Sequence, residues 1–329
     1  MDLITPARTW APRETAEKDV QPDVEAPMPK LQQVVMFFSV VGPIAGLVAA
    51  IVLLWKKNGA WGMGWPQLVC MGAMYAICGF GVTIGFHRLF THKAFETRRW
   101  LRLLLAICGS AAGQGMFIRW CATHRRHHQQ ADREGDPHSP HMHGGGVKGL
   151  LLGLYHAHVG WCFDADRPDL ARSIADLQSD KTLLLIDQLY FLWVGLGILA
   201  PGIGLGIWLH SWNGFFSGMI WGGLARICLM QHATWSINSV CHVWGTRPFR
   251  NIDHSTNNFP IAILSLGEGW HNNHHAFPTS ARHGLRWWEF DASYVLICVL
   301  KSVGLAWDIR LPAPTAIAAR QKSATSEEP

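Results

Sequence analysis

Four long apolar runs dominate the hydrophobic pattern of the chain, and they cover residues 34–55, 66–86, 183–208 and 213–235. Each run is close to or above the roughly 20 residues that an α-helix needs to cross the hydrocarbon core of a bilayer. Such runs are rare in the helical cores of soluble proteins, so we expect four membrane-spanning helices. The last two runs are separated by only four residues, with a very short turn at His210, Ser211 and Trp212, which predicts a tight hairpin.

A fifth apolar stretch, residues 101–118, is interrupted by Arg102, Gln114 and several small residues. It separates two histidine-rich segments, which could not share a site if they lay on opposite faces of a bilayer. We therefore expect this stretch to lie in the membrane interface or inside the water-facing part of the protein.

The fold class that follows is an all-α membrane protein with four transmembrane helices and a cytoplasmic helical cap. Thirteen Lys and Arg residues lie between Arg88 and Lys181, whereas the turn of the hairpin has none. Because basic residues favour the cytoplasmic side, we expect the cap and both termini there. The expected divisions are a mobile N-terminal tail (1–33), one membrane-embedded domain (34–310, with its cap at 87–182 and 236–310) and a C-terminal tail (311–329).

Composition supports membrane insertion and excludes some other functions. Charged residues make up only 16% of the chain, and the 17 Trp residues suit interfacial anchors. The net charge of +5 is modest, and the sequence has no basic and aromatic array that would predict nucleic-acid binding. The eight cysteines are scattered without a C-x-x-C pair, so we expect no disulfide framework and a reducing environment for the polar parts.

Candidate chemistry is concentrated in three short histidine clusters, which hold eight of the eighteen histidines. In two of them the spacing i, i+3, i+4 places three rings on one face of a helix. On a regular α-helix the members of the remaining pair, five residues apart, would diverge, so we expect that pair to straddle a helix end. The clusters are His87/His92, His124/His127/His128 and His271/His274/His275.

The ligand types narrow the choice of metal. Structural zinc sites usually contain Cys, and hard cations need oxygen ligands, but none of the three clusters contains Cys, Asp or Glu. Eight or more imidazoles exceed the coordination number of one ion, so we expect two metals. A redox ion such as iron suits a nitrogen-rich site that leaves positions for dioxygen, and oxidation of a hydrocarbon from the lipid is the function that this predicts.

The order His-x(4)-His, His-x-x-His-His, His-x-x-His-His, with the segment Glu268 to Pro278, resembles the integral-membrane fatty acyl desaturases of the delta-9 type over roughly residues 83–284. The resemblance implies O2-dependent insertion of a cis double bond into a saturated acyl chain in unsaturated fatty acid biosynthesis. It also implies two iron ions (Fe2+/Fe3+) held by nine histidines and by an asparagine that acts through water. The segment Trp235 to His242 resembles the one that carries the last two of these, which assigns Asn238 and His242.

The same resemblance implies a bent apolar tunnel for the acyl chain. Trp120 and Thr234 stand where the family lines the bend, and Tyr75 and Gly79 stand on the second span, where the closed end of the tunnel would set chain length. No residue beyond the metal centre is expected to be catalytic.

Two departures from the family pattern concern the acyl carrier. Thr123 replaces an Asp that is common in acyl-CoA members, and the segment 163–169 is acidic where those members are basic. Fewer cations weaken the case for binding the phosphates of coenzyme A, so both acyl-CoA and a phospholipid-bound acyl chain remain candidates. Electrons are expected from a separate partner, either a ferredoxin with its reductase or a protein like cytochrome b5.

Two other functions stay open from the sequence. A membrane di-iron hydroxylase of a lipid or alkane would use the same scaffold, because an oxidised metal site can return oxygen to the carbon instead of removing a second hydrogen. A metal transporter or sensor would bind without reacting, but it predicts polar ligands near the middle of the spans, whereas these ligands follow the ends of the spans.

Overall fold

The computed structural model of the chain describes residues 28–55, 64–164 and 174–321. Most of the expected N-terminal tail, the end of the C-terminal tail and residues 165–169 of the acidic segment therefore lie outside the described residues.

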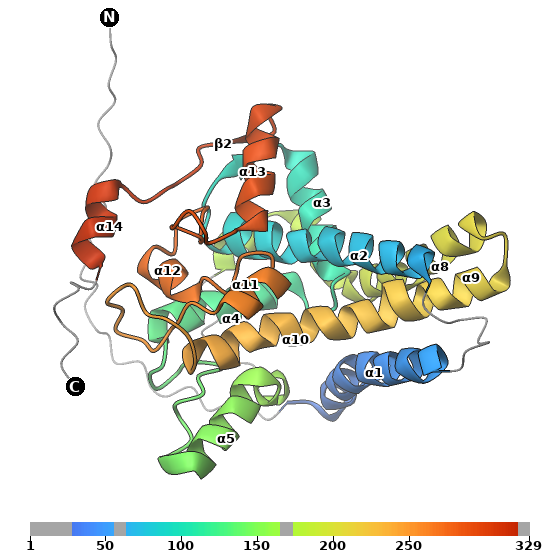
Figure 1. Ribbon diagram of the computed structural model, residues 1–329, viewed down its shortest axis with the longest axis horizontal. Helices are drawn as coiled ribbons and strands as arrows, with labels where there is room; N and C mark the ends of the chain where they lie inside the picture. The colour runs from blue at the N-terminus through green and yellow to red at the C-terminus, as the bar shows by residue number, and fades with distance from the viewer. Residues whose placement is uncertain (1–27, 56–63, 165–173, 322–329) are drawn as a thin grey trace, which may run out of the picture.

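The described residues are mostly helical (Figure 1). The α-helices are α1 (Lys30–Trp55), α2 (Trp65–Phe80), α3 (Arg99–Ser110), α4 (Phe117–Gln130), α5 (Gly146–His158), α6 (Ala175–Gln178), α7 (Lys181–Gln188), α8 (Tyr190–Trp208), α9 (Trp212–Gly218), α10 (Arg226–Ser239), α11 (Phe259–Leu264), α12 (His271–Ala276), α13 (Ala292–Ser302) and α14 (Pro314–Arg320). Two π-helices, η1 (Gly81–Thr91) and η4 (Met219–Ala225), two 3₁₀ turns, η2 (Gly160–Phe163) and η5 (Val240–His242), and two short antiparallel strands, β1 (Glu96–Thr97) and β2 (Ala306–Trp307), complete the fold.

Three helices of the described part are long and apolar enough to cross a membrane: Lys30–Val52, Trp65–Thr91 and Tyr190–Trp208. They match the first three expected runs, and α2 continues into η1 as one span. Many of their apolar side chains are exposed, including Phe38 and Ile203, as expected of surfaces that face lipid. Trp65 and Trp208 meet at one end of the bundle, which is typical of an aromatic belt at a membrane interface.

The start of the third expected run is wrong by seven residues, because 183–188 belong to a separate helix, α7, and the span begins at Tyr190. Asp180 caps α7 by accepting from the backbone N–H groups of Thr182 and Leu183, and Leu183 is buried in the core. Asp187 accepts a 2.9 Å hydrogen bond from the backbone N–H of Ile118. These polar contacts hold α7 against α3 and α4 instead of extending the span.

The fourth expected run, 213–235, is not among the three bilayer-length helices; it is divided into α9, η4 and α10. Arg226 lies within it and is fully buried. Its guanidinium donates to the carbonyls of Ala111, Gly197 and Gly222 at 2.9 to 3.1 Å, so its charge points into the bundle. The tight hairpin at residues 210–212 is present, and α8 and α9 pack against each other.

The fifth apolar stretch does not form a spanning helix. It contains α3, whose 12 residues correspond to about 18 Å, well short of the roughly 30 Å hydrocarbon core. α3 packs against η1 at a close approach of two glycines: a Cβ on Gly81 would lie 2.1 Å from the backbone nitrogen of Gly109. This contact fixes the end of the second span against the water-facing elements.

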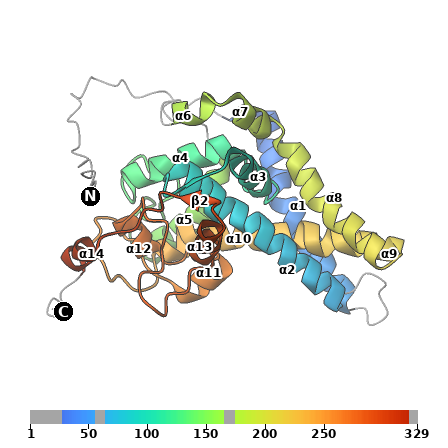
Figure 2. The same cartoon turned by 90° about the horizontal axis from the view of Figure 1, so that it is seen from above.

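The helices α4, α11 and α12 gather at the end of the bundle opposite the α8–α9 turn (Figures 1 and 2). The C-terminal segment also lies at this end: Gln321 pairs with Phe249, and Arg320 contacts the ring of Phe277. The three histidine clusters are carried by η1, α4 and α12, so the fold brings them to one end of the bundle.

Candidate metal centre and acyl cavity

The first histidine pair depends on π-helical winding at the end of the second span. The backbone N–H of His92 donates to the carbonyl of His87, five residues earlier, at 3.1 Å. His92 follows the last residue of η1, so the pair straddles a helix end as expected. Because a π-turn brings residues five apart to the same side, the two rings converge, with centroids 4.8 Å apart.

The second and third clusters each divide their rings between two groups. On α4, His124 and His128 join one group and His127 joins the other; on α12, His274 joins the first group, and His271 and His275 join the second. Within each group the possible ligand atoms all lie within 4.8 Å of one another. The first group is His87, His92, His124, His128 and His274, and the second is His127, His242, His271 and His275.

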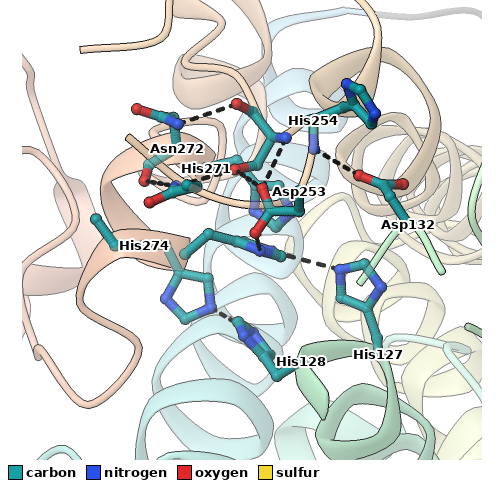
Figure 3. A network of polar contacts seen from close by, with 12 residues as sticks. His127, His128, Asp132, Asp253, His254, His271, Asn272 and His274 are labelled. Atoms are coloured by element: carbon teal, nitrogen blue, oxygen red, sulfur yellow. Dashed lines mark hydrogen bonds and ion pairs between the residues drawn. The ribbon is translucent and has the colours of Figure 1, made fainter. Parts of the chain in front are cut away.

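Ring nitrogens converge within both groups at the spacing of ligands around one ion. In the first group the Nε2 atom of His274 lies 3.1 Å from the Nε2 atom of His87 and 2.8 Å from that of His128. The contact with His128 is drawn in Figure 3. In the second, His242 and His271 place their Nε2 atoms 3.1 Å apart. Nitrogen ligands about 2.1 Å from a metal are roughly 3 to 3.5 Å apart, so both groups fit a metal ion.

Burial keeps most of these imidazoles neutral. Desolvation, assisted by the neighbouring histidines, lowers the pKa values of His92, His124, His128, His271 and His274, and burial lowers the pKa of His275 to about 4. A neutral ring keeps the lone pair that a metal needs. The Nε2 of His92 is buried and has no hydrogen-bond partner among the described residues, which leaves a ligand atom available.

Carboxylates orient four of the nine rings from behind, and sequence reasoning missed all four. Each accepts from the Nδ1 side of its histidine, which turns Nε2 toward the centre. The pairs are His87 with Glu268 at 2.5 Å, His127 with Asp136 at 3.0 Å, His242 with Asp132 at 2.8 Å and His275 with Asp253 at 3.0 Å. Asp132 also accepts from the backbone N–H of His254 (Figure 3).

The electrostatics of these carboxylates follow from their partners. Burial alone would raise the pKa of Asp132, but the hydrogen bonds that it accepts from His242, Ser139 and the backbone N–H of His254 outweigh burial and hold that pKa well below its usual range. Burial of Asp253 is outweighed in the same way by His275. The carboxylates are therefore ionised and supply negative charge next to the ligand groups, which would balance the charge of bound cations.

A buried ion network lies behind the first group. Arg88 is fully buried and its Nη2 lies 3.0 Å from both the Glu268 and the Asp291 carboxylates. His283 places its Nδ1 3.2 Å from Glu268. Asp291 in turn caps α13 by accepting from the backbone N–H of Tyr294. The network therefore connects α13 to the carboxylate that holds His87.

A narrow cavity of about 30 Å³ lies directly beside the two groups, and Trp120, Thr234 and Asn238 are among the expected residues that line it. His87, His124 and His271 also line it. The Trp120 ring stacks on the ring of His124 with centroids 5.1 Å apart.

Gly79 and Tyr75, expected at the closed end of the tunnel, do not line this cavity but lie behind side chains that do. A Cβ on Gly79 would be 2.7 Å from Leu266 Cδ1 and 2.9 Å from Met230 Cε, and both of those side chains line the cavity. Tyr75 packs beside Met230, and its hydroxyl donates to the carbonyl of Leu264 at 2.7 Å.

The loop after α4 packs against the second group. His138 is buried with its ring centroid 4.4 Å from that of His127, and the Nε2 of His141 lies 2.7 Å from the carbonyl oxygen of His242. A signal for the missed carboxylates lies in the same loop, since Asp132 and Asp136 follow the second cluster closely. Asp253 has no such local signal, because it is 22 residues from His275.

The class that this fold and site define is a helical protein that places a polyhistidine centre, able to hold metal, at the end of bilayer-length apolar helices. Residues 60–297 match the family described as fatty acid desaturase. The chain belongs to the fatty acid desaturase family, and it is an enzyme that acts as a fatty acyl desaturase.

Three curated relatives show how far the similarity extends. The chain is 41% identical over 281 residues to hex-5-enoyl-[acyl-carrier protein] acetylenase of Moorena producens (strain JHB), covering 85% of this chain and 86% of that protein. It is 38% identical over 236 residues to sn-1 stearoyl-lipid 9-desaturase of Anabaena variabilis, covering 71% and 79%. It is 38% identical over 253 residues to acyl-CoA C20 Delta5-desaturase of Anemone leveillei, covering 75% of each.

Proposed function

We propose that the protein uses two iron ions and dioxygen to insert a cis double bond into a saturated fatty acyl chain. The observation that carries the proposal is the convergence of nine imidazoles in two groups beside a narrow cavity lined by Trp120, Thr234 and Asn238. The ligands of the first iron would be His87, His92, His124, His128 and His274. The ligands of the second would be His127, His242, His271 and His275, with Asn238 reaching it through water.

The bound irons would supply the oxidising power toward dioxygen that breaking unactivated C–H bonds requires. The residues of the protein would position the acyl chain and keep water away from the metal centre. Trp120 and Thr234 would hold the acyl chain beside both groups, and the narrowness of the cavity would exclude bulk water. Tyr75 and Gly79 lie behind Met230 and Leu266 and would limit how far the chain can extend. The four carboxylates would keep the ligand rings oriented throughout turnover.

The bond position and carrier belong to the same proposal. A delta-9 product is supported by the similarity to a stearoyl-lipid 9-desaturase, although relatives with other positions and carriers are equally similar. An acyl group esterified in a membrane lipid is favoured over acyl-CoA, because the acidic segment 163–169 offers few cations for the phosphates of coenzyme A. Electrons would come from a separate protein such as a ferredoxin with its reductase.

The orientation that we propose has four crossings, with the α9–α10 helix as the fourth, and a cytoplasmic site and termini in the inner membrane of a bacterium. Arg226 supports a crossing role for this helix, because its guanidinium donates hydrogen bonds to carbonyls inside the bundle and does not face lipid.

The test is expression of the full chain in a host that lacks unsaturated fatty acids, followed by gas chromatography and double-bond mapping of the host lipids. A new cis alkene at one position is the expected product. A hydroxylated chain would assign the protein to the hydroxylase alternative. Lipids that stay fully saturated, despite a membrane-inserted and iron-loaded protein and a competent electron donor, would contradict the proposal.

A further inference from the structure

A lateral slot opens between two helices that are candidate membrane spans, α1 and α8. Its volume is about 340 Å³, within the roughly 300–1,000 Å³ of ligand sites. Phe38, Gly42 and Pro43 form the wall on α1, Phe191 and Val194 form the wall on α8, and Leu224, Ile227 and Gln231 form the floor. Among these and the other described lining residues there is no charged side chain.

The slot adjoins a second cavity of about 480 Å³, called the inner cavity below. Val35, Ser39, Tyr190 and Gln231 are among the residues that line both. The inner cavity shares Trp120 and Thr123 with a small pocket that also touches Asn238 and His124. The three spaces therefore adjoin one another from the flank of α1 and α8 to the histidine groups, and the one beside His124 is the smallest, at about 20 Å³.

Pro43 removes one backbone hydrogen bond from α1 beside the slot. Pro43 lacks the N–H that would bond to the carbonyl of Ser39, four residues earlier. Gln231 instead donates to that carbonyl at 3.1 Å and to the carbonyl of Gly113 at 2.8 Å. The side chain of Gln231 thus holds α1 in place where the slot meets the inner cavity, and its own Oε1 is buried with no partner among the described residues.

The side chains that line the slot and the inner cavity favour an acyl lipid over acyl-CoA as the ligand. Coenzyme A carries several phosphates and requires several cations, but Arg119 is the only charged residue among the described residues that line the inner cavity and the slot. An acyl chain of a lipid that stays in the bilayer needs only an apolar opening on the flank of the candidate spans, and the walls of the slot are apolar.

Resting on the desaturase function proposed above, we propose that the slot between α1 and α8 is the lateral entrance for the acyl chain of a membrane glycerolipid. The chain would pass from the bilayer over Gln231 into the inner cavity and then past Trp120 to the metal centre. The lipid would not have to leave the membrane, and its head group would stay at the membrane surface.

Gly42 and Gly72 offer a matched pair of variants to test this entrance. A Cβ at either position would meet nothing within 4 Å, but Gly42 lines the slot whereas Gly72 is on α2, outside it. The iron-loaded enzyme would be reconstituted, with dioxygen and with a ferredoxin and its reductase as electron donor, in vesicles of 1-stearoyl-2-oleoyl phosphatidylglycerol with a trace of the same lipid carrying a mid-chain diazirine. Photolabelled peptides and desaturated lipid are measured on the same sample.

The expected result is labelling of the peptides that carry Val194 and Ile227 in the original protein, because both residues line the slot and Ile227 is buried in its floor. Gly42→Phe should reduce both this labelling and lipid desaturation at least tenfold, whereas Gly72→Phe should change neither more than twofold. Val194→Trp fills the slot from the other wall and should repeat the loss if Gly42→Phe does not fold. Absence of label in the slot, or undiminished lipid desaturation in both filled variants, would overturn the inference.

The two proposals fail in different ways. Labelling does not depend on turnover, so a labelled but chemically inactive enzyme would contradict the desaturase function and leave the entrance supported. An active enzyme whose slot is unlabelled would retain the function and refute the lateral entrance. The same conclusion would follow if the enzyme did not convert the lipid but converted stearoyl-CoA supplied from water, equally well in Gly42→Phe and in the original protein.

Discussion

Four of the nine candidate ligand rings have a carboxylate on the side that faces away from the centre. The pairing of His242 with Asp132 shows what this achieves: Asp132 is held in turn by Ser139 and by the backbone N–H of His254, so the imidazole has a fixed orientation before any metal binds. The spacing of the histidines does not predict these carboxylates, because an orienting carboxylate can come from any loop that lies nearby in the fold.

Asp132→Asn tests this support. The amide keeps the size of the side chain but removes the charge, so His242 becomes a weaker ligand, and we expect metal affinity or activity to fall about 10- to 100-fold. Retained iron is measured after dialysis against a chelator. Glu96→Gln, which removes a partly exposed carboxylate paired with Arg102, is the control and should retain iron normally. Equal retention in the two variants would contradict the role of Asp132.

The stability of the metal-free protein should depend on pH through its buried histidines. Burial lowers the pKa of His275 to about 4 and that of His138 to about 3, whereas both would titrate near 6.5 in the unfolded chain. Between about pH 4 and 6.5 the unfolded chain binds more protons, so the free energy of unfolding decreases as the pH falls through this window.

The measurement is the thermal unfolding midpoint of the metal-free protein in detergent at about pH 7.5 and about pH 5, with a lower midpoint expected at the lower pH. A midpoint that stays constant or rises on acidification would show that these rings are not held neutral in the folded state.

At the scale of elements, local irregularities place the ligands. The π-helix η1 brings His87 and His92 together. The helix α7 is separate from the span α8, because Asp180 caps the start of α7 and Asp187 accepts a hydrogen bond from α4. The histidine spacing on α4 and α12 could be predicted from sequence, because helical periodicity alone decides which rings share a face. The π-winding and the break before Tyr190 could not, because both depend on contacts between distant segments, such as Asp187 with Ile118.

Gly81→Ala tests the contact that fixes η1. The added methyl group would overlap the backbone of α3 at Gly109, and overpacking of this kind costs about 1–3 kcal/mol. We expect a lower unfolding midpoint and weaker iron retention, because His87 would shift with the helix. Gly72→Ala on the neighbouring helix α2, where the methyl group meets nothing within 4 Å, is the matched control. Normal stability and iron content in Gly81→Ala would show that the close approach does not position the site.

At the scale of the whole molecule, three bilayer-length helices and the segmented α9–α10 helix extend from the end that holds both histidine groups. The apolar runs predicted three bilayer-length helices correctly, because length and hydropathy suffice to find long apolar helices. They did not separate the fourth from a buried helix, since α10 is buried over much of its length and carries Arg226. Asn238, Thr234 and Trp120 meet at one cavity, whereas the lateral slot could not be read from any sequence pattern.

The proposed orientation predicts opposite labelling of two cysteines. Asn213 is exposed at the start of α9, next to the α8–α9 turn, and Cys298 is exposed on α13 at the end that holds the site. In intact cells a membrane-impermeant maleimide should react with Asn213→Cys and leave Cys298 unmodified until the cells are lysed. Labelling of Cys298 in intact cells, with protection of position 213, would invert the orientation.

The most direct test of the account is the number of iron ions bound per chain in the purified protein and in His274→Ala. His274 belongs to the first group and lies 2.8 Å from His128, so its loss should weaken that group and leave the second. We predict two irons per chain in the original protein, and about one iron, no alkene formation and normal membrane insertion in His274→Ala. Two firmly bound irons and full activity in the variant, or no iron in the original protein, would contradict the claim that these imidazoles hold a di-iron centre.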